Sequence, residues 1–248
     1  MGNNHGKLSM KMKRLFATLF CSGTFATALI LTSCGGDGNS NIKETGSNFK
    51  KLPKNEILGD AVNISYEYSV KWNANEQEWK EALEENREKN ANNSDKMEKN
   101  YQKITSKHKE GRIQIEDEAN AAMEKEKATL IGKAIPFECE DGLGYEVVEC
   151  MINDVSTSYL SFTYKLKPVD AEMFAKADVM IWQGGYKCLD YNGNTILDSN
   201  GNEIGGTFGL NNDSKSQLKN GETVEMKHGF SLGEPSLADF AKIKFVKP

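Results

Sequence analysis

The sequence predicts an α+β fold, in which a mostly antiparallel, β-sandwich-like domain carries an inserted, charged helical hairpin. Three observations lead to this prediction. Residues 61–72 alternate between apolar and polar side chains, residues 76–130 lack proline and are rich in Glu, Lys, Ala and Asn, and the chain from residue 133 onward consists of short apolar runs separated by turn signals. We expect the β-rich domain to span residues 56–248, with the hairpin inserted at about 76–130.

The first 33 residues have the features of a secretory signal. Four basic residues precede an apolar run from Leu15 to Leu31, which is short for a membrane span, since a span needs about 20 apolar residues. The sequence Leu31-Thr32-Ser33-Cys34 follows, with a cysteine directly after two small residues. This stretch resembles the lipobox of bacterial lipoproteins, in which the cysteine receives the lipid.

The resemblance implies that residues 1–33 are removed and that Cys34 becomes an N-terminus carrying three acyl chains, palmitate among them. It therefore implies a membrane partner through the lipid anchor, and a location in the outer membrane, on its periplasmic face or at the cell surface. Residues 34–55 begin with small polar residues and predict a flexible tether. Their composition resembles uncharacterised lipoproteins of Bacteroidales-type bacteria. In such lipoproteins acidic residues just after the cysteine can mark export to the cell surface. Asp37 is the one acidic residue close behind Cys34, so the choice between the periplasmic face and the cell surface stays open.

The charge of the chain excludes some partners. Residues 1–33 contain four basic residues and no acidic one, so their removal changes the formal net charge from −5 to −9. An acidic chain is not expected to bind nucleic acid, and this balance also argues against a basic membrane-docking face.

Residues 61–72 are the first predicted element of the domain. Alternation of β-branched and aromatic residues with polar ones is typical of a half-buried strand. We therefore predict a strand whose inner face consists of Val62, Ile64, Tyr66, Tyr68, Val70 and Trp72.

The charged segment predicts two helices. Start signals at Asn75 and Asp95 and a break at 90–94 give helices over about 76–89 and 95–130. One stripe of the second helix holds Met97, Tyr101, Ile104 and His108. This thin apolar face favours a hairpin that leans on the β-rich domain. Coiled-coil oligomerisation and partial disorder are the alternatives.

The second half of the chain predicts short strands joined by tight turns. The pairs Asn192-Gly193 and Asn200-Gly201 predict type I′ hairpins. We expect strands at 134–139, 145–152, 160–166, 178–182, 186–189, 195–197, 204–210, 223–230 and 243–246. The Asp-x-Asn-Gly-Asn turns, with Asn220-Gly221-Glu222 before a strand, resemble immunoglobulin-like modules of bacterial lipoproteins. This resemblance transfers no functional residue.

Three cysteines remain once Cys21 is removed and Cys34 is lipidated. Cys139 and Cys150 flank a turn-like sequence and could face each other across a hairpin as a disulfide, which would leave Cys188 free. An odd number of cysteines leaves the pairing open.

Two groups of residues suggest ligands. Trp182, Tyr186 and Tyr191 surround Gly184-Gly185 and could form a sugar-binding platform, since aromatic rings stack on apolar sugar faces. Packing in the core or at its rim is the alternative for these rings. The runs that begin at Asp190 and Asp198 resemble the start of a calcium loop, but they lack its glycine at the sixth position and its glutamate at the twelfth. We therefore predict hairpin turns there, and we predict neither a metal nor a cofactor.

Catalysis finds little support in the sequence. His108 falls in a predicted helix and His228 in a predicted surface strand, and the chain has no nucleophile, metalloprotease or phosphate-loop motif. The prediction is a lipid-anchored, non-enzymatic binding or structural module with a protein or glycan partner. A carbohydrate-binding surface lipoprotein is the first alternative and a hydrolase the second.

Overall fold

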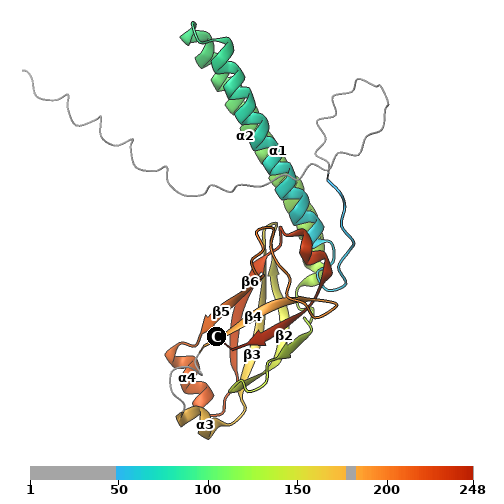
Figure 1. Ribbon diagram of the computed structural model, residues 1–248, viewed down its shortest axis with the longest axis vertical. Coiled ribbons are helices and arrows are strands. Elements are labelled where there is room, and N and C mark those ends of the chain that lie inside the picture. The colour runs from blue at the N-terminus through green and yellow to red at the C-terminus, as the bar shows by residue number, and fades with distance from the viewer. Residues whose placement is uncertain (1–48, 177–182, 248) are drawn as a thin grey trace, which may run out of the picture. The chain divides into compact units, whose positions relative to one another are not determined.

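The computed structural model describes residues 49–176 and 183–247, which form a helical hairpin and two β-sheets (Figure 1). This confirms the predicted class at the level of α+β. In chain order the elements are α1 Ala61–Lys89, α2 Ser94–Leu130, β1 Phe137–Cys139, β2 Tyr145–Val155, β3 Tyr159–Pro168, α3 Ala171–Lys176, β4 Gln183–Asp190, β5 Gly205–Gly209, α4 Asn212–Lys219, β6 Val224–Ser231, the 3-10 helix η2 Pro235–Asp239 and β7 Phe240–Val246. The predicted strand 178–182 lies outside the described residues.

The strands form one sheet in the order β1-β7-β4-β5 and another in the order β2-β3-β6. The pairing of β1 with β7 is parallel, and the other pairings are antiparallel. Aromatic side chains join the two sheets. Phe162 of β3 meets Tyr186 of β4 edge to face, with ring centroids 5.1 Å apart. Tyr164 of β3 meets Phe245 of β7 at 4.9 Å. The core therefore lies where side chains of both sheets pack together.

Residues 61–72 form the beginning of α1, so the strand predicted for them is wrong. Helical spacing brings together the pairs Tyr68–Trp72, with ring centroids at 5.6 Å, and Glu67–Lys71, with an ion pair at 2.8 Å. Burial follows tertiary packing instead of alternation, because Ser65 is fully buried whereas Tyr66 is only partly buried. In the described chain the hairpin thus precedes the named strands and is not an insertion after the first of them.

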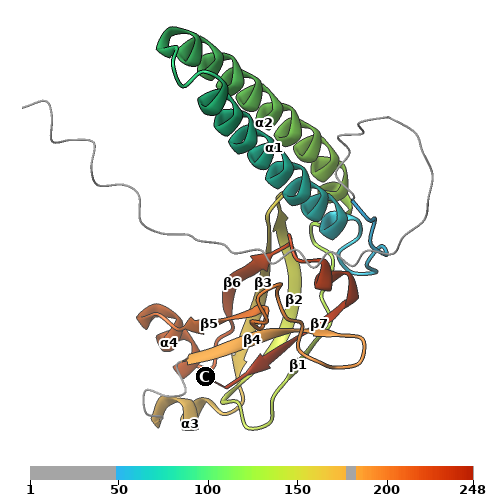
Figure 2. The same cartoon turned by 45° about the horizontal axis from the view of Figure 1, so that its top comes forward.

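The second predicted helix is confirmed. The helix α2 begins one residue before the predicted start, and the Asn93 side chain caps it by accepting a hydrogen bond from Lys96 N at 3.0 Å. The predicted inner stripe is only partly inward, since Tyr101 is 41% exposed. Figure 2 shows α1 and α2 running side by side and extending away from the sheets.

The base of the hairpin is joined to the β half by the segment before α1 and by the end of α2. The buried amide of Asn55 donates to Ala238 O at 3.0 Å and to Phe240 O at 2.7 Å. Lys127 of α2 makes an ion pair with Asp154 of β2 at 2.7 Å. These contacts join segments far apart in the sequence, so the base of the hairpin is part of the same folded unit as the sheets.

The two Asn-Gly turns are not the predicted type I′ turns. A type I′ turn needs positive φ at both central residues. Only the glycines meet that condition, with φ of 84° at Gly193 and 82° at Gly201. The amides of these glycines donate to Asp190 O and Asp198 O, both at 3.0 Å, so each turn begins at the aspartate and ends at the glycine.

Candidate functional site

The predicted sugar platform does not form as a group of three exposed rings. Trp182 lies outside the described residues. Tyr186 points into the core, is 3% exposed, and donates its hydroxyl hydrogen to Gly229 O at 2.6 Å. Tyr191, in the turn after β4, is 56% exposed. The prediction for Tyr186 is therefore corrected, because Tyr186 is a core residue. It cannot form a sugar-binding platform together with Tyr191.

A glycine on the neighbouring strand explains the burial of Tyr186. Gly206 lies opposite Tyr186 in the β4–β5 register, and a Cβ on Gly206 would come within 2.8 Å of the Tyr186 ring. The ring thus covers a position that has no side chain. Burial raises the pKa of Tyr186, so its phenol stays neutral.

The two calcium-like runs are stabilised from within. Asp190 Oδ1 accepts hydrogen bonds from Asn192 N at 2.9 Å and from Asn194 N at 2.8 Å. Asp198 makes the equivalent bonds with Asn200 N at 2.9 Å and Asn202 N at 2.8 Å. These bonds lower the pKa of both carboxyl groups, led by the backbone of Asn194 for Asp190 and by the side chain of Asn202 for Asp198. The aspartates therefore serve as turn caps.

All three cysteines of the described chain are free thiols. The predicted bridge between Cys139 and Cys150 is not made, because the local register separates the two residues. Ile135 N donates to Cys150 O at 2.9 Å, so the residue beside Cys150 is Ile135. Cys139 instead lies in β1, opposite Phe245.

A buried aromatic group that the sequence analysis missed lies between the two sheets. The hydroxyl groups of Tyr145 and Tyr164 are buried and have no hydrogen-bond partner among the described residues. His228, predicted to lie on the surface, packs its ring against Tyr164, Tyr186 and Phe208 at 5.6 to 5.9 Å. Burial lowers the pKa of His228 and raises those of Tyr145 and Tyr164. Neutral side chains packed in this way favour a core role over acid–base chemistry.

The hairpin has its own polar interior. The guanidinium of Arg112 lies 4.1 Å from the centroid of the Trp72 ring. Asn75 Nδ2 donates to His108 O at 3.2 Å, and a Cβ on Gly111 would lie 2.7 Å from Asn75 Oδ1. The glycine that interrupts the apolar stripe of α2 therefore makes room for an asparagine of α1.

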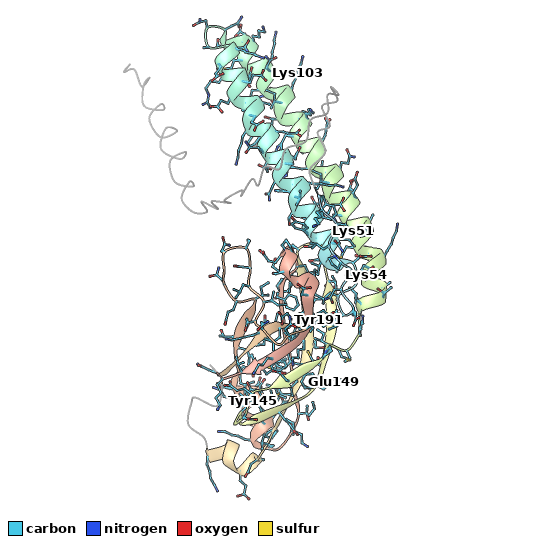
Figure 3. All side chains as sticks on the ribbon, turned by 45° about the vertical axis from the view of Figure 1, so that its right-hand side comes forward. Lys51, Lys54, Lys103, Tyr145, Glu149 and Tyr191 are labelled. Atoms are coloured by element: carbon cyan, nitrogen blue, oxygen red, sulfur yellow. The ribbon has the colours of Figure 1, made fainter. Side chains whose placement is uncertain are left out.

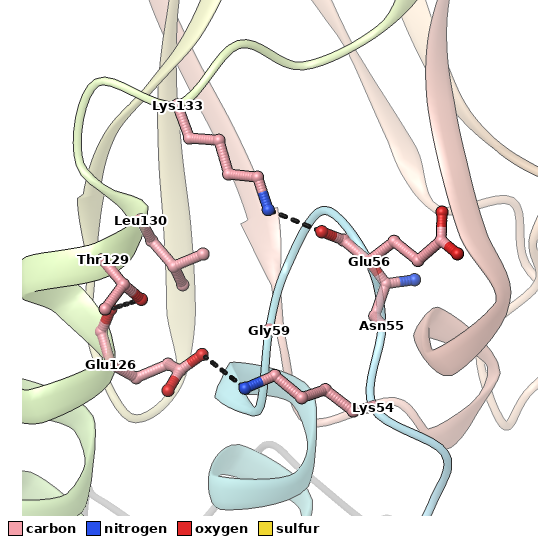
Figure 4. Close-up of a pocket in the computed structure, with 8 residues that line it drawn as sticks. All are labelled: Lys54, Asn55, Glu56, Gly59, Glu126, Thr129, Leu130 and Lys133. Atoms are coloured by element: carbon pink, nitrogen blue, oxygen red, sulfur yellow. Dashed lines mark hydrogen bonds and ion pairs between the residues drawn. The ribbon is translucent and has the colours of Figure 1, made fainter.

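A pocket of about 530 Å³ lies beside the base of the hairpin (Figure 4). Residues before α1, at the end of α2 and just after it line the pocket: Lys54, Asn55, Glu56, Gly59, Glu126, Thr129, Leu130 and Lys133. Lys133 Nζ donates to Glu56 O at 2.5 Å, and Figure 4 shows Lys54 and Lys133 approaching from opposite sides. Two lysines and two glutamates line the pocket, and its ammonium groups make it the candidate site for anionic groups.

Glu126 fixes one wall of this pocket. Its Oε1 accepts a hydrogen bond from Asp60 N at 2.9 Å and lies 3.8 Å from Lys54 Nζ. Gly59 is at φ 59°, and a Cβ there would collide with Glu126 Oε1 at 1.8 Å. The carboxylate is thus committed to holding the loop before α1. Comparison of the chain with protein-family models, curated proteins and solved structures found no significant match.

Proposed function

We propose that this protein is a lipid-anchored lipoprotein of the outer membrane, acylated at Cys34, whose non-enzymatic domain serves as a binding or structural module. The sequence Leu31-Thr32-Ser33-Cys34 after a basic and apolar leader carries this proposal. No helix of residues 49–176 and 183–247 is long and apolar enough to cross a membrane.

The hairpin is the part of the domain that supports a binding or structural role. Contacts with the β half lie near its base, at Lys127 and at Ser69, whose hydroxyl faces Gly233. Farther out, α1 and α2 pack on each other through Trp72, Trp79 and their partners. A long helical hairpin that contributes little to the core exposes most of its surface, and this surface is available to a partner.

The two sheets complete the proposed module. We assign them to a sandwich, because the inward residues of β3 contact those of β4 and β7 from the other sheet. Such a body provides a rigid base for the hairpin.

The first experiment tests the anchor. The wild-type protein and the Cys34→Ser variant are expressed in a Gram-negative host, the membranes are separated by centrifugation, and the intact masses are measured. We expect the wild type in the outer membrane fraction, cleaved before Cys34 and carrying acyl chains, and the variant without acyl chains. An uncleaved leader, or a variant that fractionates like the wild type, would contradict the proposal.

A further inference from the structure

The base of the hairpin, which includes the described residues nearest in sequence to Cys34, carries four exposed lysines. Lys50, Lys51 and Lys54 lie in the segment before α1, and Lys133 follows α2. Lys54 and Lys133 line the same pocket, and Figure 3 shows Lys51 and Lys54 together at the base of the hairpin. We call these four residues the basal lysine cluster.

The segment that carries three of these lysines was predicted to belong to the flexible tether, but from residue 49 onward it packs against α1. Leu52 N donates to Asn63 Oδ1 at 2.8 Å, and Asn63 Nδ2 donates back to Leu52 O at 3.1 Å. The Phe49 ring packs on Tyr66 with centroids 5.6 Å apart. Apolar and amide side chains therefore fix the segment, while its three lysines are exposed.

Most of the positive charge in the cluster is not neutralised by carboxylates. Among the described residues only Lys54 of the four makes ion pairs, at 3.4 Å to Asp60 and 3.8 Å to Glu126, and its side chain is 61% exposed. The Lys133 ammonium donates to a backbone carbonyl. The pairs are long and the Lys54 side chain is largely exposed, so they hold its ammonium group only weakly.

The position of the cluster selects the partner. Lys50 follows Cys34 by sixteen positions, so these lysines are close in the chain to the proposed lipid. A basic segment next to a lipid anchor is attracted to anionic headgroups, and the attraction acts only within about a Debye length of roughly 10 Å. The net charge of −9 argued against a basic membrane-docking face. Within a Debye length of the bilayer, however, the local charge matters more than the net charge. Ile131, two positions before Lys133 in the chain, is an apolar residue that is 48% exposed.

We propose that the basal lysine cluster docks this end of the protein on anionic phospholipid headgroups, so that the body is oriented on the bilayer as well as tethered to it. This inference rests on the proposed acylation of Cys34. The phosphate groups of the bilayer are the occupant, held by Lys54 and Lys133 at the pocket and by Lys50 and Lys51 in the segment before α1.

A second set of exposed lysines provides a matched control. Lys96, Lys99, Lys103 and Lys107 lie on one side of α2, three or four residues apart, in the outer half of the hairpin. They equal the basal cluster in number and charge but are far from the anchor in the sequence. Figure 3 shows Lys103 well apart from Lys51 and Lys54.

The test uses the full lipidated protein, reconstituted in vesicles of phosphatidylcholine alone or mixed with phosphatidylglycerol. Intact mass first establishes the acyl chains, and their absence would overturn both the proposed function and this inference. Lysine acylation by a water-soluble reagent is then followed by mass spectrometry. We expect modification of the basal cluster to slow by about threefold or more in anionic vesicles and to recover at high salt, with the α2 lysines unchanged. Equal rates in both vesicles, or protection of the α2 lysines instead, would overturn docking while leaving the anchor intact.

Two quadruple variants and a phosphate control complete the design. In the wild type, docking on anionic vesicles should slow amide hydrogen exchange over residues 49–60. Replacement of the four basal lysines by glutamine should abolish this slowing. The same replacement of the four α2 lysines should preserve it. Circular dichroism checks that both variants fold. If inorganic phosphate added to phosphatidylcholine vesicles gave the same lysine protection, the site would bind free anions and the membrane assignment would be wrong.

Discussion

The imidazole of His108 lies flat on the indole of Trp79, with ring centroids 4.7 Å apart and planes 14° apart. The stack joins α2 to α1, and His108 Nε2 also lies 2.8 Å from Glu76 Oε1. Since the outer hairpin has few apolar side chains, this contact is a main cross-link between its two helices.

Replacing His108 with alanine should loosen the outer hairpin while leaving the sheets intact. Loss of a stacked, hydrogen-bonded ring costs about 1–2 kcal/mol. Amide hydrogen exchange over residues 73–112 should therefore become about tenfold faster. The exposed neighbour Lys107→Ala is the control and should exchange like the wild type. Equal exchange in the two variants would show that the stack does not stabilise the hairpin.

Asn55→Ala should be one of the most destabilising polar substitutions in the chain. Asn55 Oδ1 accepts hydrogen bonds from Ile57 N and Leu58 N, both at 2.8 Å, and its amide donates to two carbonyls near β7. Its loss leaves several buried backbone groups unpaired, at a cost of about 3 kcal/mol. Urea unfolding measures this, with the exposed Asn73→Ala of α1 as the control. A change below about 1 kcal/mol would contradict the expected role.

Gly184→Ala should destabilise the contact between the sheets. A Cβ on Gly184 would lie 2.2 Å from the Tyr145 hydroxyl oxygen and 2.5 Å from the Phe208 ring. Relief requires movement of packed rings, and overpacking of this kind costs about 1–3 kcal/mol. Gly209→Ala, where a Cβ would meet nothing within 4 Å, is the matched control. Thermal unfolding should give a lower midpoint for Gly184→Ala alone.

The three thiols should differ strongly in reactivity. Cys139 is exposed, whereas Cys150 and Cys188 are buried, and burial raises the pKa of Cys150 to about 12. A maleimide should label Cys139 in the native protein and the other two only after unfolding in denaturant. Labelling of no thiol in the oxidised native protein, together with a mass two hydrogens lower, would instead indicate a disulfide.

Acid should weaken the two Asp-x-Asn-Gly-Asn turns. Their hydrogen bonds hold the pKa values of Asp190 and Asp198 below the usual value in the folded state. The stabilisation is therefore present above the unfolded pKa of about 3.9 and is lost as pH falls through the lower folded values. Carbon-detected NMR titration should show the midpoints of both carboxyl groups below the ordinary aspartate value of about 3.9. Midpoints near 3.9 would contradict the turn geometry.

Local pattern was sufficient where an element depends on its own residues. The charged run around Asp95 predicted α2, and alternation around Phe162 predicted β3, because helix caps and half-buried strands have local signals. The same reasoning failed for residues 61–72. Alternation there fits a strand, but the pairs Tyr68–Trp72 and Glu67–Lys71 and the contact with α2 stabilise a helix.

The candidate site was less accessible to prediction than the fold. Lys54 and Lys133 are 79 positions apart, and their joint position depends on Glu126 holding the loop at Gly59. Tyr186 was a candidate for the sugar platform because aromatic rings stack on sugars, yet its ring is buried, since Gly206 across the sheet makes room for it.

The sequence by itself determined the charge of the hairpin and the α+β class, and it carries the proposed lipobox at Cys34, since each depends on residue types along one stretch of chain. Only the tertiary structure decided that residues 61–72 are helical, that Tyr186 is buried and that Lys54 and Lys133 line one pocket. These features depend on contacts between distant segments, such as Asn55 with Phe240, whose energies no local pattern contains.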